Sequence, residues 1–176
     1  LAGALGRGAL PKLEELFLTA NHLGDQGVAT LAVPLRALPA LIVLQLGNNG
    51  IGEQGVVSLV ASLGANDDGF NSLKKLGLRG NKLTDKGCAT LASAIDGGGM
   101  PMVEQVQLLD DSLSGEARQA VDDAVRRVSV KRSADRMRQG IRGHSGGKGI
   151  AHFEQANRQM SARVAWLHAV ANAHAP

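Results

Sequence analysis

One phrase recurs four times along the chain, and it limits the possible folds more than any other feature. The phrase is Leu-x-x-Leu-x-Leu-x-x-Asn, and a polar turn and an amphipathic run follow it. Its copies are Leu13, Leu16, Leu18 and Asn21; Leu41, Leu44, Leu46 and Asn49; Leu73, Leu76, Leu78 and Asn81; and a weaker Val103, Val106, Leu108 and Asp111. The last positions of the four copies are 28, 32 and 30 residues apart. A nearly constant period of this length predicts a solenoid of stacked repeats.

Within each copy the apolar residues first alternate and then recur at helical spacing. Leu16 and Leu18 alternate with Glu15, Phe17 and Thr19, which predicts a short strand with one buried face. The later apolar residues lie three or four positions apart, at Val28, Leu31 and Leu35; Val56, Leu59 and Leu63; Cys88, Leu91 and Ile95; and Val121 and Val125. Each repeat is therefore predicted to contain one strand and one helix, in an α/β fold.

The polar residue that ends each phrase has a predicted structural role. It stands among apolar neighbours that are expected to bury it, and a buried amide without partners costs about 1–3 kcal/mol. The amide of Asn has both an acceptor and donors for backbone groups of adjacent repeats. We therefore predict a ladder formed by Asn21, Asn49, Asn81 and Asp111. Asp111 cannot donate when ionised, which suits a terminal turn with one neighbour.

The turn after each phrase repeats an acidic residue and a glycine. The acidic residues are Asp25, Glu53 and Asp85, and the glycines are Gly27, Gly55 and Gly87. A carboxylate in the first turn of a helix is stabilised by the helix dipole. The alternative is a row of metal ligands, but one carboxylate per repeat does not make a metal site, and no metal site is predicted. The glycines are expected to mark close contact between helix and strand, where a Cβ would separate the layers.

The phrase, the turn and the helical half together resemble a known family. Leu31-Ala32-Val33-Pro34-Leu35 and Leu91-Ala92-Ser93-Ala94-Ile95 fit its helical half. The chain resembles leucine-rich repeats of the ribonuclease-inhibitor-like class over about residues 1–128. The resemblance implies a curved solenoid with parallel strands on the concave face and helices on the convex face. Related repeats occur in the ribonuclease inhibitor, NOD-like receptors and Ran GTPase-activating proteins, and most members of the family bind proteins.

The outward strand residues form the predicted protein-binding surface. They are Glu15, Phe17, Thr19, Val43, Gln45, Lys75, Arg79, Gln105 and Gln107. Phe17 is its best anchor, and Lys74, Lys75 and Arg79 make a basic patch farther along. The alternative is a plain solvated strand face, because Gly47 and Gly77 on the same face offer no side chain and the chain has no Tyr. The predicted function is a scaffold for an unidentified protein partner.

Two narrower functions follow from the resemblance alone. One is regulation of a small GTPase, as in Ran GTPase-activating proteins, and the other is the ligand-sensing segment of a NOD-like sensor. Leu1 to Leu5 align with the helical residues Leu31 to Leu35, so the chain is expected to begin within an earlier repeat and to be a fragment of a larger protein. An N-terminal targeting signal therefore cannot be assessed.

The composition changes after the repeats. Residues 1–128 are predicted to be the repeat domain, 129–150 a disordered, basic, Gly-rich linker, and 151–176 a single amphipathic helix. Residues 126–176 hold ten Lys or Arg and two acidic residues, or +8, whereas residues 1–125 hold nine basic and fourteen acidic residues, or −5. Such a basic tail either contacts anionic surfaces through its charge or is simply solvated. It lacks interleaved aromatics for base stacking, so no specific nucleic acid is predicted.

No chemical motif accompanies the repeats. Cys88 aligns with Val28 and Val56, which predicts a core residue, and a single cysteine favours a reducing, intracellular compartment such as the cytoplasm. His22 has no nucleophile partner that the sequence supports. We therefore predict no enzyme and no cofactor. No apolar run reaches the ~18 residues that a membrane span requires. The longest spacer between repeats, residues 64–72, is expected to be a surface loop.

Overall fold

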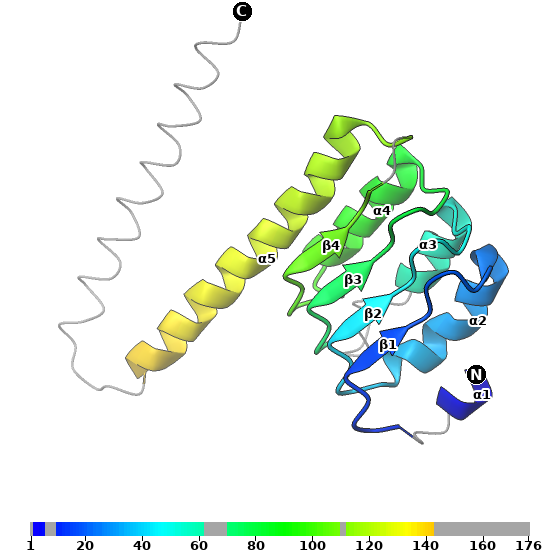
Figure 1. Cartoon of the computed structure of the whole chain (residues 1–176). Coiled ribbons are helices and arrows are strands. Elements are labelled where there is room, and N and C mark those ends of the chain that lie inside the picture. The colour runs from blue at the N-terminus through cyan, green and yellow to red at the C-terminus, as the bar shows by residue number, and fades with distance from the viewer. Residues whose placement is uncertain (1, 6–9, 62–69, 110–111, 143–176) are drawn as a thin grey trace, which may run out of the picture. The chain divides into compact units, whose positions relative to one another are not determined.

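The computed structural model describes residues 2–5, 10–61, 70–109 and 112–142 (Figure 1). The chain divides into two compact units, residues 1–133 and 134–176. The first unit contains the repeats, and the description below concerns it unless stated otherwise. Asp111, residues 64–69 of the expected surface loop, residues 143–150 of the expected linker and the amphipathic helix expected over 151–176 lie outside the described residues.

Four short parallel strands form one sheet in sequence order. They are β1 (Glu15–Phe17), β2 (Val43–Gln45), β3 (Lys75–Gly77) and β4 (Gln105–Gln107). The register aligns the second apolar residue of every phrase, because Leu16 pairs with Leu44, Leu44 with Leu76, and Leu76 with Val106. The predicted stacking of successive repeats is therefore confirmed.

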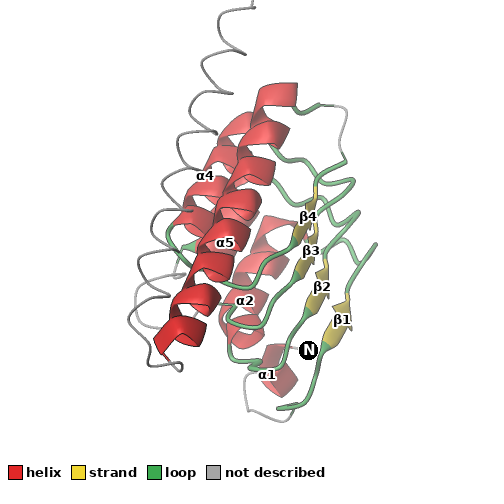
Figure 2. Cartoon of the chain, turned by 90° about the vertical axis from the view of Figure 1, so that its left-hand side faces the viewer, coloured by secondary structure: helices red, strands yellow, loops and turns green. Residues whose placement is uncertain are grey.

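The helices cover one face of this sheet and leave the other face open (Figure 2). They are α1 (Ala2–Leu5), α2 (Gly24–Arg36), α3 (Glu53–Val60), α4 (Asp85–Asp96) and α5 (Gly115–Arg142). Helix α2 contacts both α1 and α3, and α3 contacts α4. Parallel strands joined by helices on one side are the α/β leucine-rich repeat fold that the sequence predicts.

The core lies between the sheet and the helices. Leu44 and Leu76 on the strands are fully buried, and Val28, Val56 and Cys88 pack at equivalent places on the helices. Cys88 is thus a core residue, as its alignment predicted. Leu16 is only half-buried, because no described strand lies beyond β1. The interior strands therefore bury more apolar surface than the first one, and burial of such surface is the main stabilising term.

A tight turn leads into every strand. The backbone N–H of the first residue of each phrase donates to the carbonyl three residues earlier, as from Leu41 to Leu38 and from Leu73 to Phe70. Phe70 belongs to the segment expected to be a surface loop, yet it is only 3% exposed. That expectation was wrong for Phe70, because it occupies the place of Leu38 beneath the turn and completes the core.

Helix α5 extends past the predicted end of the repeat domain. Residues 129–142 were expected to begin a disordered linker, whereas the structure places them in this helix, up to Arg142. Residues 116–139 contain no Gly or Pro and are rich in Ala and Arg, which favour helix. Pairs three residues apart, Arg126 with Asp123 and Arg138 with Asp135, add small favourable contacts on the helix surface.

An ion pair ties α5 to the end of α4. The guanidinium of Arg127 donates to both carboxylate oxygens of Asp96, at 2.9 and 2.7 Å. This hydrogen bonding holds the pKa of the Asp96 carboxyl below its ordinary value and raises the pKa of Arg127. Because the folded pKa of Asp96 is depressed, its contribution to stability is present at neutral pH and is lost as the pH falls through that value. Both groups are largely exposed, so the contribution is small.

Candidate protein-binding surface

Alternate residues of the strands project from the open face of the sheet, which we call the strand face. The register places Glu15, Val43, Lys75 and Gln105 in one row across it, and Phe17, Gln45, Gly77 and Gln107 in the next. Glu15, Phe17, Lys75 and Gln105 are exposed, whereas Val43, Gln45 and Gln107 are half-buried. Thr19 and Arg79, one step beyond the strands, are exposed as well. The register therefore places seven of the nine predicted binding residues on one surface.

Two large apolar side chains are exposed near opposite edges of the strand face. Phe17 on β1 is 63% exposed, and Leu109, two residues past the end of β4, is 61% exposed. Leu109 was not among the predicted binding residues. Its alignment with Thr19 and Arg79, two other outward residues that follow a strand, is the sequence signal that identifies it. An exposed Phe has a large apolar area to bury against a partner.

The charge on the strand face changes sign between its strands. Glu14 and Glu15 make the β1 side acidic, whereas Lys74, Lys75 and Arg79 make the β3 side basic. Lys74 lies 3.9 Å from the Glu104 carboxylate, so part of its charge is compensated within the chain. The remaining separation of charge gives the face an orientation, because a partner with the opposite arrangement binds better than a reversed one.

Two glycines stand in the middle of the strand face, at Gly47 and Gly77. A Cβ added at Gly77 would overlap the side-chain amide of Gln45 on the neighbouring strand. Gly77 is itself buried by this contact. A Cβ at Gly47 would lie 3.1 Å from the Arg79 carbonyl oxygen, which is also tight. The two glycines thus let neighbouring chain segments lie close together, and they present no side chain to a partner.

The asparagines that end the phrases bond across the repeats. Asn49 Oδ1 accepts from the backbone N–H groups of Asn21 at 2.9 Å and Leu23 at 3.3 Å. Asn81 Oδ1 accepts in the same way from Asn49 and Ile51, both at 3.0 Å. Each amide thus joins its own repeat to the preceding one.

The amide nitrogens complete these bonds. Asn49 Nδ2 donates to the carbonyl oxygens of Leu18, Leu46 and Gly47 at 2.8–3.1 Å. Asn49 is 2% exposed and Asn81 is buried too, but Asn21 is exposed. The expected burial of Asn21 was wrong, because no described strand lies beyond β1 to cover it. Its Nδ2 donates only to the carbonyl of Thr19 among the described residues.

The acidic residues at the helix starts form a second set of links between repeats. Asp25 Oδ1 accepts from the backbone N–H of Gly52 at 2.6 Å, and Asp85 Oδ1 accepts from that of Ser114 at 3.1 Å. Glu53 instead pairs with Lys86 Nζ at 2.7 Å, and this hydrogen bond raises the pKa of Lys86. Helix-dipole reasoning alone missed these bonds, although the acidic residue recurs at one position of the repeat.

The structure does not support the predicted reason for the glycines of these turns, which was close contact between helix and strand. A Cβ at Gly55 would lie 2.6 Å from both Asp25 Oδ1 and the Ile51 side chain. The close contact is therefore with the helix start of the preceding repeat, not with a strand. A Cβ at Gly87 would make only ordinary contacts, with Glu53 and Thr84. Gly55 is thus the position where the Asp25 link requires a glycine.

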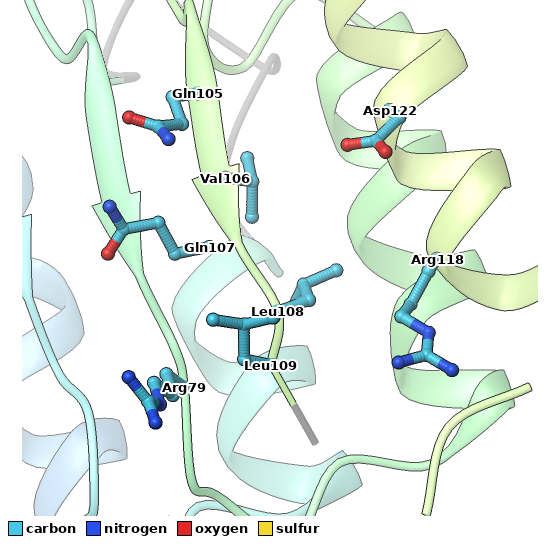
Figure 3. A pocket seen from close by; sticks show the side chains of 8 residues that line it. All are labelled: Arg79, Gln105, Val106, Gln107, Leu108, Leu109, Arg118 and Asp122. Atoms are coloured by element: carbon cyan, nitrogen blue, oxygen red, sulfur yellow. The ribbon is translucent and has the colours of Figure 1, made fainter. Parts of the chain in front are cut away.

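A groove lies between β4 and α5 within the first unit (Figure 3). Its volume is about 460 Å³. Gln105, Gln107 and Leu109 line it from the strand, and Arg118 and Asp122 line it from the helix. Arg79 reaches its lower end from the segment after β3. The sequence did not predict this groove, because it exists only through the placement of α5 beside the last strand.

His22, metal-binding clusters and membrane-spanning helices were also considered in the described part of the chain. His22 is an exposed turn residue with a φ of 53°. Residues 2–5, 10–61, 70–109 and 112–142 contain no group of three or more His, Cys, Asp or Glu side chains placed to hold a metal ion. Within the same ranges, no helix combines the length and the apolarity that crossing a membrane would require.

The chain was compared with protein families, curated proteins and solved structures. A family model described as "Leucine Rich repeat" matches residues 9–32 and 71–92. No curated protein matches the sequence. The structure is similar to that of leiomodin-1 actin-binding site 2, with a TM-score of 0.55 at 12% identity, over 81% of this chain and 95% of the other. The tropomodulin C-terminal domain of Caenorhabditis elegans gives a TM-score of 0.46 at 15% identity, over 77% and 95% of the two chains.

Proposed function

We propose that this chain, which is built from leucine-rich repeats, is a scaffold that binds a partner protein on its strand face. The observation that carries the proposal is that a large apolar side chain on this face is exposed while its backbone is held in a regular sheet. Phe17 is 63% exposed, although the hydrogen bonds and register of a regular sheet hold its backbone in place. A large apolar side chain on a rigid support loses little freedom on binding, so more of its burial contributes to affinity.

The surroundings of Phe17 and Leu109 also favour a protein partner. Interfaces combine buried apolar anchors with a polar rim, and the strand face has acidic, basic and amide side chains between its two apolar residues. The separation of charge favours a partner with basic groups opposite Glu15 and acidic groups opposite Lys75 and Arg79. A small molecule would gain less from side chains spread over four strands, since small ligands usually bind in concave pockets.

The narrower functions remain proposals of lower rank. No described residue distinguishes regulation of a small GTPase or ligand sensing from general protein binding. A GTP-hydrolysis assay with and without the chain tests the first directly. Leiomodin-1 actin-binding site 2 shares the fold at 12% identity, which makes actin a reasonable first protein to test. The absence of an enzymatic activity and an intracellular location are parts of the same proposal, and they rest on the sequence.

Site-specific photo-cross-linking tests the strand face. We expect a benzoyl-phenylalanine that replaces Phe17 to form covalent adducts with a defined protein in an extract of the source cells. The matched control places the same residue at Val33, which is 66% exposed on α2, on the other side of the sheet. Adducts are counted by mass spectrometry after illumination.

Positions 17 and 33 lie on different sides of the sheet but have similar exposure, so non-specific cross-linking affects both equally. The proposed function requires adducts from position 17 at least roughly tenfold above those from position 33, which corresponds to about 1.4 kcal/mol of preference. Equal labelling from both positions, or labelling from position 33 alone, would contradict binding at the strand face.

A further inference from the structure

We propose that the free edge of β4 binds an extended, acid-bearing segment of a partner protein, which adds to the sheet as a fifth strand. This inference rests on the proposed protein-binding function, but it concerns a different surface. The strand face presents side chains, whereas the edge of β4 presents backbone groups. Each surface therefore has its own test.

The backbone N–H and carbonyl groups on one side of β4 bond to the repeat of β3, whereas those on the other side face away from β3. The N–H of Gln105 donates to Lys74, the carbonyl of Gln107 accepts from Leu78, and the carbonyl of Leu109 accepts from Gly80. In a strand, the backbone groups of successive residues point to opposite sides. Those of Val106 and Leu108 therefore point away from β3, where no described strand lies. An open strand edge is a template for pairing with another chain.

The groove provides the space that such a strand needs. Helix α5 stands beside this edge, and the intervening volume of about 460 Å³ falls within the range of known binding pockets. Figure 3 shows the Asp122 carboxylate turned from α5 toward β4, and the Arg118 side chain extending on the α5 side down to the level of Leu109. A segment in the groove would thus contact the backbone of β4 on one side and charged side chains on the other.

The charges specify the chemistry of the segment. Arg79 and Arg118 lie toward the Leu109 end of the groove, whereas Asp122 lies beside the Gln105 end (Figure 3). Arg118 donates to the carbonyl of Leu113 at 3.0 Å, and a guanidinium has further N–H donors for a ligand. A carboxylate that reaches either guanidinium group makes a strong, charge-assisted hydrogen bond.

These positions also give the segment a direction. If the fifth strand continues the parallel sheet, its later residues lie toward the Leu109 end. The segment would then have its Asp or Glu residues near its C-terminal end, at the arginines. Other occupants fit less well: residues 143–176 of this chain carry Lys148, Arg158 and Arg163 against a single Glu154, so they do not complement two arginines.

A displayed peptide library tests the proposal with the full chain as bait. Random twelve-residue peptides are selected for binding, and the dissociation constants of the enriched peptides are measured by fluorescence anisotropy. We expect enrichment of alternating β-branched residues followed by Asp or Glu toward the C-terminal end. The double variant Arg79→Gln, Arg118→Gln should lose roughly tenfold or more in affinity, because both charge-assisted contacts are removed.

The control for the α5 half of this double variant is Arg126→Gln, which removes one positive charge from α5 at a residue that does not line the groove. We expect this variant to bind the peptides as the parent chain does. Circular dichroism of all variants checks that the fold is kept. Enriched peptides without acidic residues, affinity that the double variant retains, or an equal loss in Arg126→Gln would each overturn the proposal.

Amide NMR distinguishes strand addition from simple charge attraction. On addition of an enriched peptide, we expect the amides of Val106 and Leu108 to gain protection from hydrogen exchange, while those of Gln105 and Gln107 change little. Protection gained only by amides close to Arg79 and Arg118 would refute a fifth strand. Concentration-dependent self-association of the chain in place of peptide binding would refute it as well. A negative result here leaves cross-linking at Phe17 unaffected, so the two proposals fail separately.

Discussion

Replacement of Asn49 by alanine is expected to lower the free energy of unfolding by about 3 kcal/mol. The side chain is 2% exposed, and its Oδ1 accepts from two backbone N–H groups of the preceding repeat. Its Nδ2 donates to three backbone carbonyl oxygens. Alanine would leave these groups without their partner in a largely buried place, and each unpaired buried group costs about 1–3 kcal/mol. Urea denaturation followed by circular dichroism measures the change.

The control for this prediction is Asn21→Ala at the equivalent position of the preceding repeat. Asn21 is exposed, and its side chain donates to one carbonyl, that of Thr19, at 3.1 Å. Water can replace this bond, so we expect a change within about 0.5 kcal/mol, as for most surface substitutions. Similar losses at the two positions would mean that the ladder does not join the repeats as described.

Replacement of Leu44 by alanine is expected to have an effect of the same size or larger, about 3–4 kcal/mol. Leu44 is fully buried, and its neighbours in the register are Leu16 on one side and Leu76 on the other. A Leu→Ala change in a packed core removes apolar burial and leaves a cavity, which costs about 2–5 kcal/mol. The unfolding midpoint in urea should fall accordingly, because the repeats on both sides of Leu44 lose a core contact.

The matched variant is Leu16→Ala on the first strand. Leu16 has the same place in its phrase, but it is only half-buried. We expect about half the loss of Leu44→Ala, because less apolar area is removed from the core. An equal or greater loss for Leu16→Ala would show that the interior strands do not bury the common core.

The strands, their order and their register followed from the sequence because one periodic pattern determines all three. Leu16, Leu44 and Leu76 could be aligned by eye, and a repeat of constant length must stack them. The entry turns were also visible: proline follows Leu10, Leu38 and Met100. Asn71 follows Phe70 in place of proline, so the sequence predicted a loop at that position. The sequence did not predict that α5 continues over residues 129–142, because their basic composition is also typical of a linker.

The candidate site was predictable only in part. Alternation placed Glu15, Phe17 and Lys75 on the strand face, since the direction of a strand side chain depends on its position alone. Two contacts between repeats depend on side-chain conformations that the packing of neighbouring repeats determines. They are the contact of Gln45 with Gly77 and the hydrogen bond from the Gly52 N–H to Asp25. The groove beside β4 depends on where a helix from the last repeat packs. Neither kind of feature is encoded in the repeat itself.

Hydrogen bonds detected by NMR provide the most direct test of the stacked repeats that the whole interpretation requires. Scalar couplings across the bonds should join the Leu18 N–H to the Gln45 carbonyl, Leu46 to Gly77, and Leu78 to Gln107, which the structure places at 2.8, 2.8 and 2.9 Å. All three couplings, each spanning one repeat, are expected in the same spectrum. Couplings of these amides to carbonyls within their own repeats, or rapid exchange of all three with solvent, would contradict the solenoid and the surface built on it.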